Sequence, residues 1–279
     1  MKKKVNRILP AVALLLSLLL SCKGKPSAGT SQPVRLITPE TIKADKEQAF
    51  VNYIYSLTSR HPLNEAQDSI AAFFLRNQKD TQMIEIVNRY LYDPNSPYRN
   101  EDLYLPFVRG LAASKYTPDS LRAYYARQAE MCALNQYGQK APDFEFRTLS
   151  EKTERLYDID AEYLMLFFSN PGCTACKGII DEVQSVEPLL VAQADGRLAV
   201  VNVYIDEDVQ AWKDYAETYP ESWHSGYDSR MVIRNSTLYN VRAIPSLYLL
   251  DKDKKVLMKD APTENVIGYL CSVLAKVNK

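Results

Sequence analysis

The pattern of hydrophobic and polar positions changes once along the chain, near residue 138. Before it, between about residues 39 and 137, apolar residues recur at helical spacing. The clearest set follows an i, i+1, i+4, i+7, i+8 pattern and consists of Met83, Ile84, Val87, Tyr90 and Leu91. Such spacing places side chains on one face of an amphipathic helix. The region 39–137 is therefore predicted to be helical.

Other helices are predicted on both sides of that one. They cover Asp45–Leu57, the stretch around Ile70 to Phe74, and Asn100–Ala113. A last helix is expected to start with Thr117 as the capping residue and Pro118 in its first turn, and to end near Gly138. One apolar stripe of this helix is predicted to contain Leu121, Tyr124, Tyr125, Gln128 and Cys132.

After Gly138 the apolar residues form continuous runs instead. Three runs predict strands buried on both faces of a sheet: Tyr163–Phe168, Leu198–Ile205 and Ser246–Leu250. Shorter strands are expected around Phe144 to Leu149, at Thr153–Leu156 and at Val256–Met258, with helices over Cys173–Ala194 and from Thr263 onward. This order predicts an α/β domain with a mixed sheet over residues 138–279, preceded by an all-α domain over 39–137.

The N-terminus has the build of a secretory signal. A basic start is followed by an apolar region of 13 residues, Ile8–Leu20, which is short for a membrane span. The run ends in Leu19-Leu20-Ser21-Cys22, which looks like a bacterial lipobox, so residues 1–21 are expected to be removed and Cys22 lipidated. An uncleaved anchor helix is the alternative. Residues 22–38 then form a tether at the membrane.

Charge and composition exclude several classes of protein. The whole chain has 34 basic and 34 acidic residues; without residues 1–21 it has 34 − 4 basic residues, a net charge of about −4. Nucleic acid is therefore not an expected partner. Five cysteines are too few for a disulfide-stapled small domain, but signal and lipidation place the protein outside the cytoplasm. Lys23, in place of an Asp that retains some lipoproteins at the inner membrane, favours the outer membrane.

The segment Cys173-Thr174-Ala175-Cys176 follows a buried strand and opens a helix. Unpaired backbone N–H groups at a helix N-terminus favour a thiolate over a thiol. Cys173 is the candidate attacking thiol and Cys176 the candidate resolving thiol of a disulfide-exchange site. A purely structural disulfide is the alternative. Zinc would need two further ligands and haem attachment a CxxCH motif, so no metal and no cofactor is expected.

The motifs Gly138-Gln-Lys-Ala-Pro-Asp-Phe144, Cys173–Cys176 and Ala243-Ile244-Pro245 together resemble the thioredoxin-like superfamily, in particular its membrane-anchored TlpA/ResA-like branch. The resemblance covers residues 138–279. It implies that Pro245 is a cis-proline facing the dithiol and that Ile244 offers its backbone to a substrate strand. A trans Pro245 at a strand start is the alternative. The order of the two domains also resembles a family of bacterial lipoproteins whose helical domain has no assigned function.

Three residues depart from the family pattern. Gly172 stands where many thioredoxins have Trp, Phe167 where they have a buried Asp, and Ile179 where ResA-like proteins have Glu. The acid that manages the proton of the buried thiol is thus missing from its usual places. A cationic Lys177 beside Cys176 would favour a thiolate there; the alternative is an exposed Lys that is only solvated, which is more common at such a position.

These observations predict a lipid-anchored, extracytoplasmic thiol-disulfide oxidoreductase that exchanges disulfides with other proteins. Its electrons must come from a partner. The alternative is a non-catalytic binding lipoprotein whose helical domain, with ten of the 19 tyrosines between Tyr53 and Tyr137, binds a protein or glycan. Cys132 and Cys271 are expected to be buried apolar residues, with a disulfide between them left open.

Overall fold

The computed structural model describes residues 39–275, all within one compact unit. The predicted signal peptide (1–21), the tether (22–38) and the predicted lipidation site Cys22 lie outside the described residues. Within residues 39–275, no helix combines the length and the apolar composition needed to cross a membrane.

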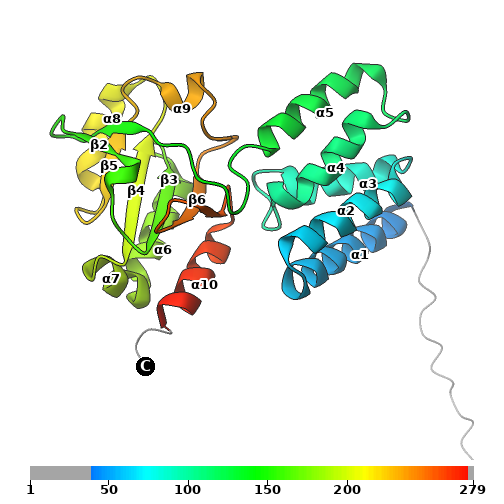
Figure 1. Cartoon of the computed structure of the whole chain (residues 1–279), viewed down its shortest axis with the longest axis horizontal. Helices are drawn as coiled ribbons and strands as arrows, with labels where there is room; N and C mark the ends of the chain where they lie inside the picture. Colours follow the sequence, from blue (N-terminus) through cyan, green and yellow to red (C-terminus); the bar gives the residue numbers. More distant parts are fainter. Residues whose placement is uncertain (1–38, 276–279) are drawn as a thin grey trace, which may run out of the picture. The chain divides into compact units, whose positions relative to one another are not determined.

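The first part of this unit is all helical (Figure 1). Its helices are α1 (Pro39–Arg60), α2 (Leu63–Asn77), α3 (Thr81–Val87), the π-helical turn η1 (Asn88–Tyr92), α4 (Glu101–Ala113) and α5 (Asp119–Cys132). Met83, Val87 and Leu91 of the predicted stripe are buried in its core, with Phe50, Ile70 and Phe107 from the neighbouring helices. The helical prediction for this region is confirmed.

Two helices of this part start at side-chain caps. Asp80 accepts a hydrogen bond from the Met83 backbone N–H at 3.1 Å and also ties α3 to α1, because Lys46 Nζ lies 2.6 Å from its carboxylate. Asn100 caps α4 by accepting from the Leu103 backbone N–H. Satisfying these N–H groups is what allows a helix as short as α3 to begin at a defined residue.

The prediction for the last helix was wrong in detail. α5 begins at Asp119, with Pro118 rather than Thr117 in the capping position, and it ends at Cys132 instead of near Gly138. Leu121 and Tyr124 of the predicted stripe are exposed, whereas Gln128 and Cys132 are buried. α5 packs mainly against α4, so only the C-terminal half of the stripe reaches the core.

The second part contains a seven-stranded mixed sheet in the order β2-β1-β5-β4-β3-β6-β7. The strands are β1 (Glu145–Arg147), β2 (Thr153–Arg155), β3 (Tyr163–Phe168), β4 (Leu198–Tyr204), β5 (His224–Tyr227), β6 (Ser246–Asp251) and β7 (Val256–Met258). β3 runs parallel to β4 and antiparallel to β6, and β4 runs parallel to β5. This arrangement is a thioredoxin-like fold, as predicted, and the three apolar runs form its central strands.

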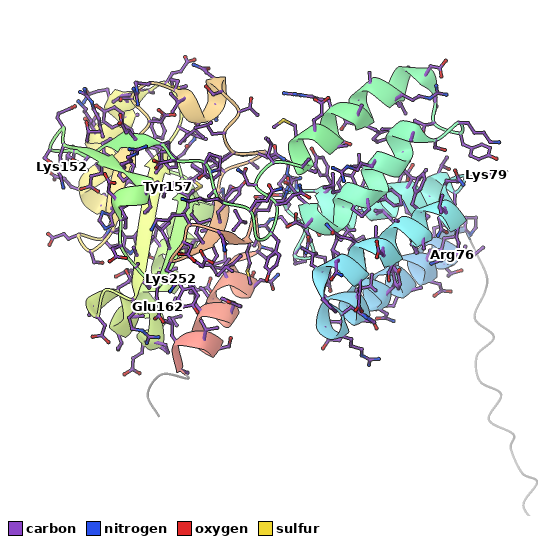
Figure 2. The ribbon with its side chains drawn as sticks, viewed as in Figure 1. Arg76, Lys79, Lys152, Tyr157, Glu162 and Lys252 are labelled. Carbon is purple, nitrogen blue, oxygen red and sulfur yellow. A yellow bond between two sulfur atoms is a disulfide. The ribbon has the colours of Figure 1, made fainter. Side chains whose placement is uncertain are left out.

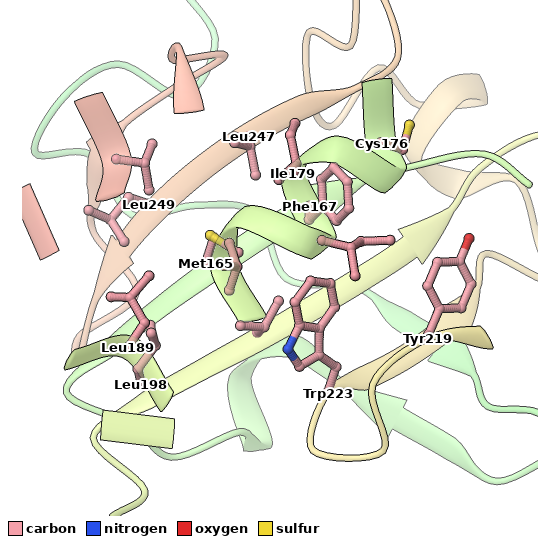
Figure 3. Close-up of a cluster of buried hydrophobic side chains, with 14 of the residues drawn as sticks. Met165, Phe167, Cys176, Ile179, Leu189, Leu198, Tyr219, Trp223, Leu247 and Leu249 are labelled. Atoms are coloured by element: carbon pink, nitrogen blue, oxygen red, sulfur yellow. The ribbon is translucent and has the colours of Figure 1, made fainter. Parts of the chain in front are cut away.

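Helices cover both faces of the sheet (Figure 1). One face packs against α6 (Thr174–Ser185), α7 (Glu187–Ala194), α8 (Val209–Tyr215) and α10 (Thr263–Leu274). Figure 3 shows part of that core, where Met165 and Phe167 of β3 meet Ile179 of α6. The other face packs against α9 (Val232–Asn235) and the segment around Phe144 and Phe146. Short 3-10 turns, η2 (Leu156–Asp158) and η3 (Ala216–Thr218), complete the connections.

The N-terminal ends of β3 and β4 are joined by an ion pair. Glu162 (Figure 2) lies just before β3, and its carboxylate is 2.7 Å from Nε of Arg197, which lies just before β4. The Tyr163 backbone N–H also donates to the Arg197 carbonyl at 3.0 Å. Both contacts hold the two strands in the register in which Tyr163 faces Leu198.

Strand β5 and helices α8 and α9 were not predicted. No strand is expected from the sequence at His224–Tyr227, yet this segment pairs with β4 inside the sheet. Only Gly226 and Tyr227 of this strand are buried, so it lacks the apolar run that marks β3 and β4. Its position depends on Gly226, where a Cβ atom would lie 2.4 Å from Phe146 and 2.6 Å from the Arg147 carbonyl oxygen of β1.

We expect Gly226→Ala to destabilise the fold by about 1–3 kcal/mol, because the added methyl group meets backbone that cannot move without breaking the β1–β5 pairing. The matched control is Gly268→Ala in α10, where nothing lies within 4 Å of the added atom. Ala is favoured over Gly inside a helix, so this variant should gain about 0.4–1 kcal/mol. Urea unfolding measures both; equal changes in the two variants would contradict the close approach at Gly226.

Asp80→Ala should cost about 1 kcal/mol at neutral pH through loss of the α3 cap. The hydrogen bond from Lys46 holds the pKa of Asp80 below its ordinary value, helped by the Met83 backbone N–H. A carboxyl group with a lowered pKa in the folded state stabilises above its unfolded pKa of about 4 and loses this effect as pH falls through the folded value. The wild-type advantage in urea unfolding should therefore shrink below pH 4. A difference independent of pH would argue against this ion pair.

Candidate functional site

The two cysteines of the CxxC segment lie at the turn between β3 and α6. Cys173 is the capping residue of α6, and its Sγ accepts a hydrogen bond from the Cys176 backbone N–H at 3.1 Å. Its own N–H donates to the Asn170 carbonyl at 3.3 Å, which closes the turn. Cys173 and Cys176 form a disulfide with their Cα atoms 5.2 Å apart. The helix therefore presents the backbone N–H of Cys176, in its first turn, to the sulfur of Cys173.

Gly172 has a left-handed backbone conformation, with φ of +69°. No atom lies within 4 Å of the position that a Cβ would take there. The constraint is thus the backbone angle and not the available space, because side-chain-bearing residues rarely adopt such a φ. The departure from the Trp found in many thioredoxins has a local physical explanation in this turn.

The two sulfurs differ in their access to solvent. Cys173 is half-buried, whereas Cys176 is 2% exposed and packs within the core cluster that contains Phe167, Ile179 and Leu247 (Figure 3). An incoming disulfide can approach Cys173 without rearrangement of the core. The geometry thus distinguishes an outer and an inner sulfur.

The segment Ile244-Pro245 lies beside this turn. In the antiparallel pairing of β3 with β6, the last residue of β3, Phe168, faces the first residue of β6, Ser246. Pro245 immediately precedes Ser246, so it lies at the sheet end from which the chain continues to Cys173. The Ile244–Pro245 peptide bond is cis. The Ile244 side chain packs against both core clusters of the sheet, and among residues 39–275 no backbone hydrogen bond involves Ile244.

No carboxylate occupies the family's usual positions, since Phe167 and Ile179 are core residues. Lys177 does not act on the sulfurs as an unpaired charge, because its Nζ lies 2.6 Å from the exposed Asp181. The carboxylate that contacts the turn is Asp206, which accepts a hydrogen bond from Asn170 Nδ2 at 2.6 Å and also pairs with Arg234. Asp206 was not among the residues predicted from the sequence. Its position just after β4 could have indicated a role in the site, because the C-terminal ends of parallel strands lie at the same edge of a sheet.

A buried polar group lies at the same end of the sheet. Ser169, which follows β3, donates from its hydroxyl to Asn202 Oδ1 of β4 at 2.6 Å and lies 3.3 Å from the Tyr219 hydroxyl. Burial raises the pKa of Tyr219, so this hydroxyl stays protonated at neutral pH. Asn202 could have been noticed in the sequence as the one amide inside the apolar run Leu198–Ile205.

The other cysteines and the histidines of residues 39–275 are not part of this site. Cys132 and Cys271 are both free thiols; Cys132 is buried, and Cys271 is only half-buried, which corrects the expectation that both are core residues. Burial, followed by the negative charge of Glu101, raises the pKa of Cys132. His224 pairs with Glu154 at 2.8 Å and His61 with Glu65 at 3.1 Å. Within residues 39–275, no group of three or more His, Cys, Asp or Glu side chains is arranged to hold a metal ion.

Comparisons with known families divide the chain in two. Residues 137–259 match the AhpC/TSA family, and residues 36–135 match a family described as a domain of unknown function (DUF5106). A crystal structure of a thioredoxin-like protein from Bacteroides caccae is similar over 85% of both chains, with 34% identity and a TM-score of 0.76. This similarity therefore includes the helical part as well as the sheet.

Two curated proteins are similar to the second part alone. The thioredoxin-like protein YneN of Bacillus subtilis is 32% identical over 120 residues, which is 42% of this chain and 66% of that protein, just under two thirds of its length. The thiol-disulfide oxidoreductase ResA of Bacillus cereus is 26% identical over 138 residues, which is 48% of this chain and 77% of that protein.

After reduction, iodoacetamide should label Cys173 roughly tenfold faster than Cys176 in the native protein, because Cys173 is more exposed and lies at the helix N-terminus. Cys132 should remain unlabelled until denaturant is added, since it is fully buried. Mass spectrometry of proteolytic peptides measures each cysteine separately. Faster labelling at Cys176 would show that the outer and inner sulfurs are wrongly assigned.

Proposed function

We propose that this chain, which belongs to the thioredoxin-like family, is a membrane-anchored thiol-disulfide oxidoreductase acting on proteins outside the cytoplasm. One observation carries the proposal: a disulfide-forming pair at the N-terminus of α6 in which one sulfur is accessible and the other is buried. A disulfide that only stabilises the fold needs neither the helix N-terminus nor this difference in access.

The reaction in the reducing direction has two steps. The Cys173 thiolate attacks one sulfur of a substrate disulfide, which breaks the substrate S–S bond and forms a mixed disulfide through Cys173. The other substrate sulfur leaves as a thiolate and takes up a proton. Cys176 then loses its proton and attacks Cys173 Sγ, which forms the Cys173–Cys176 disulfide and releases the substrate sulfur that was bonded to Cys173, and that sulfur also takes up a proton. The substrate gains two electrons, and a partner dithiol must return two electrons to this protein.

Substrate positioning is assigned to Ile244 and Pro245. The partly buried side chain of Ile244 packs against both core clusters, and its backbone groups form no hydrogen bond with residues 39–275. An extended substrate segment that pairs with these groups would lie beside the β3–α6 turn and bring its sulfur to Cys173. Such binding recognises the main-chain groups of the substrate and not its side chains, so it suits an enzyme that acts on many proteins.

Localisation follows from the N-terminal sequence. In this proposal the signal peptide, residues 1–21, is removed after export and Cys22 is lipidated. The tether 22–38 then holds domains 39–137 and 138–279 at a membrane surface that faces an oxidising compartment. Lys23 favours the outer membrane of the cell over the inner.

A second function, binding of a protein or glycan by the helical region, is favoured by exposed aromatic side chains. Tyr55 is 70% exposed and Tyr124 57% exposed, and tyrosines of this kind are common at interfaces. In this alternative the thioredoxin-like part serves as a scaffold.

The two functions are separated by insulin reduction in the presence of dithiothreitol. We expect activity in the wild type, the background rate in Cys173→Ser, and in Cys176→Ser a mixed disulfide with the substrate that persists because nothing resolves it. Cys271→Ser, which removes a free thiol outside the site, is the matched control and should keep wild-type activity. Rates of insulin reduction near background in the wild type and in all variants would contradict the oxidoreductase proposal and leave the binding function.

A further inference from the structure

A buried ion pair connects the helical region to the segment that carries Pro245. Glu101 is the first residue of α4 and is 1% exposed. Its Oε1 lies 2.7 Å from Nε of Arg242 and accepts a hydrogen bond from Asn240 Nδ2 at 2.7 Å. Both partners precede Ile244 by only a few residues. A carboxylate from outside the sheet is thus bound to the start of this segment.

Arg242 continues the connection on its other side. Its guanidinium lies 2.5 Å from Asp260 Oδ2 and stacks over the Tyr92 ring at 4.3 Å, and it also donates to the Tyr92 carbonyl oxygen. The planar fork of Arg can bridge two carboxylates in this way, whereas a Lys side chain is a single point charge. Arg242 therefore has one carboxylate from α4 and one from the strand-helix connection after β7.

Asp260 completes the contacts at the far end of the segment. Its Oδ1 accepts a hydrogen bond from the hydroxyl of Ser246, the residue after Pro245, at 3.0 Å. Asn240 and Arg242 on one side and Ser246 on the other are thus held by one buried charge network, and Ile244 and Pro245 lie between them. Removing one partner of a buried ion pair leaves an uncompensated charge, so these contacts favour one arrangement of the segment.

We propose that Glu101 is a positioning residue that sets the geometry of the Ile244-Pro245 segment for docking of extended polypeptide disulfides. The inference rests on the proposed function and gives the helical region a part in it. The substrate class affected is a disulfide within a polypeptide, which must pair with the Ile244 backbone. A small disulfide that reaches Cys173 alone does not depend on this segment.

The neighbouring residue provides a matched control. Asp102 lies in the same first turn of α4 and is 8% exposed. Its carboxylate lies 3.6 Å from Lys259 Nζ and contacts neither Asn240 nor Arg242 in the described residues. Asp102→Asn and Glu101→Gln are therefore the same type of change at neighbouring buried acids, and only the second touches the Pro245 segment.

The test compares the full-length variants in insulin reduction and in reaction with 5,5′-dithiobis(2-nitrobenzoic acid), a small aromatic disulfide. For Glu101→Gln we expect a KM for insulin at least about fivefold above wild type, with kcat and the rate with the small disulfide unchanged. Asp102→Asn should show the wild-type KM. Arg242→Lys keeps the positive charge but cannot bridge two carboxylates, so it should raise the KM for insulin as Glu101→Gln does. This variant replaces Glu101→Gln in the test if Glu101→Gln does not fold.

Direct binding separates failure of this inference from failure of the proposed function. S-carboxymethylated insulin B chain has no disulfide, so its affinity for the oxidised protein, measured by calorimetry, reports docking alone. Affinity that falls at least about fivefold in Glu101→Gln and not in Asp102→Asn supports the inference even without turnover. Equal affinities, or equal KM values in the two variants, would overturn it, whereas wild-type protein without turnover overturns the proposed function.

Discussion

The pairing of β3 with two neighbours is the constraint on which the rest of the site depends. All six residues of β3 pair with β4 on one side and with β6 on the other. Because Phe168 and Ser246 face each other at the last position, the chain leaves β3 toward Cys173 at the point where it enters β6 from Pro245. Neither the helix N-terminus nor the Ile244 backbone would form a site without this shared strand end.

The features that the sequence predicted well share one physical cause, which is burial of apolar side chains on both faces of a strand. Such burial requires a continuous run of apolar residues in β3, β4 and β6. The run can be recognised in the sequence without knowing which strands lie next to each other. β5 escaped prediction because it is half exposed at His224 and Ser225 and is held by the close approach at Gly226. Asp206 and Asn202 were not predicted for a related reason, since their partners Asn170 and Ser169 follow β3 and come near them only once β3 pairs with β4.

Long-range charge pairing is the part that periodicity cannot show. Glu101 and Arg242 are separated by 140 intervening residues and by a change of fold type, and in the sequence each looks like an ordinary surface charge. Only the packed structure shows that both are buried and that a third residue, Asp260, shares the cation. The helical part of this chain thus contributes a carboxylate to the segment that precedes β6 of the thioredoxin-like sheet.

The cap of α6 has a consequence for how this protein can be observed. The sulfur that caps the helix is the same atom that changes oxidation state, and it accepts a hydrogen bond from the backbone amide of Cys176. Oxidation or reduction changes the charge and the electron density of this acceptor atom. The amide resonance of Cys176 in a nuclear magnetic resonance spectrum is therefore an intrinsic reporter of the redox state, free of any attached label.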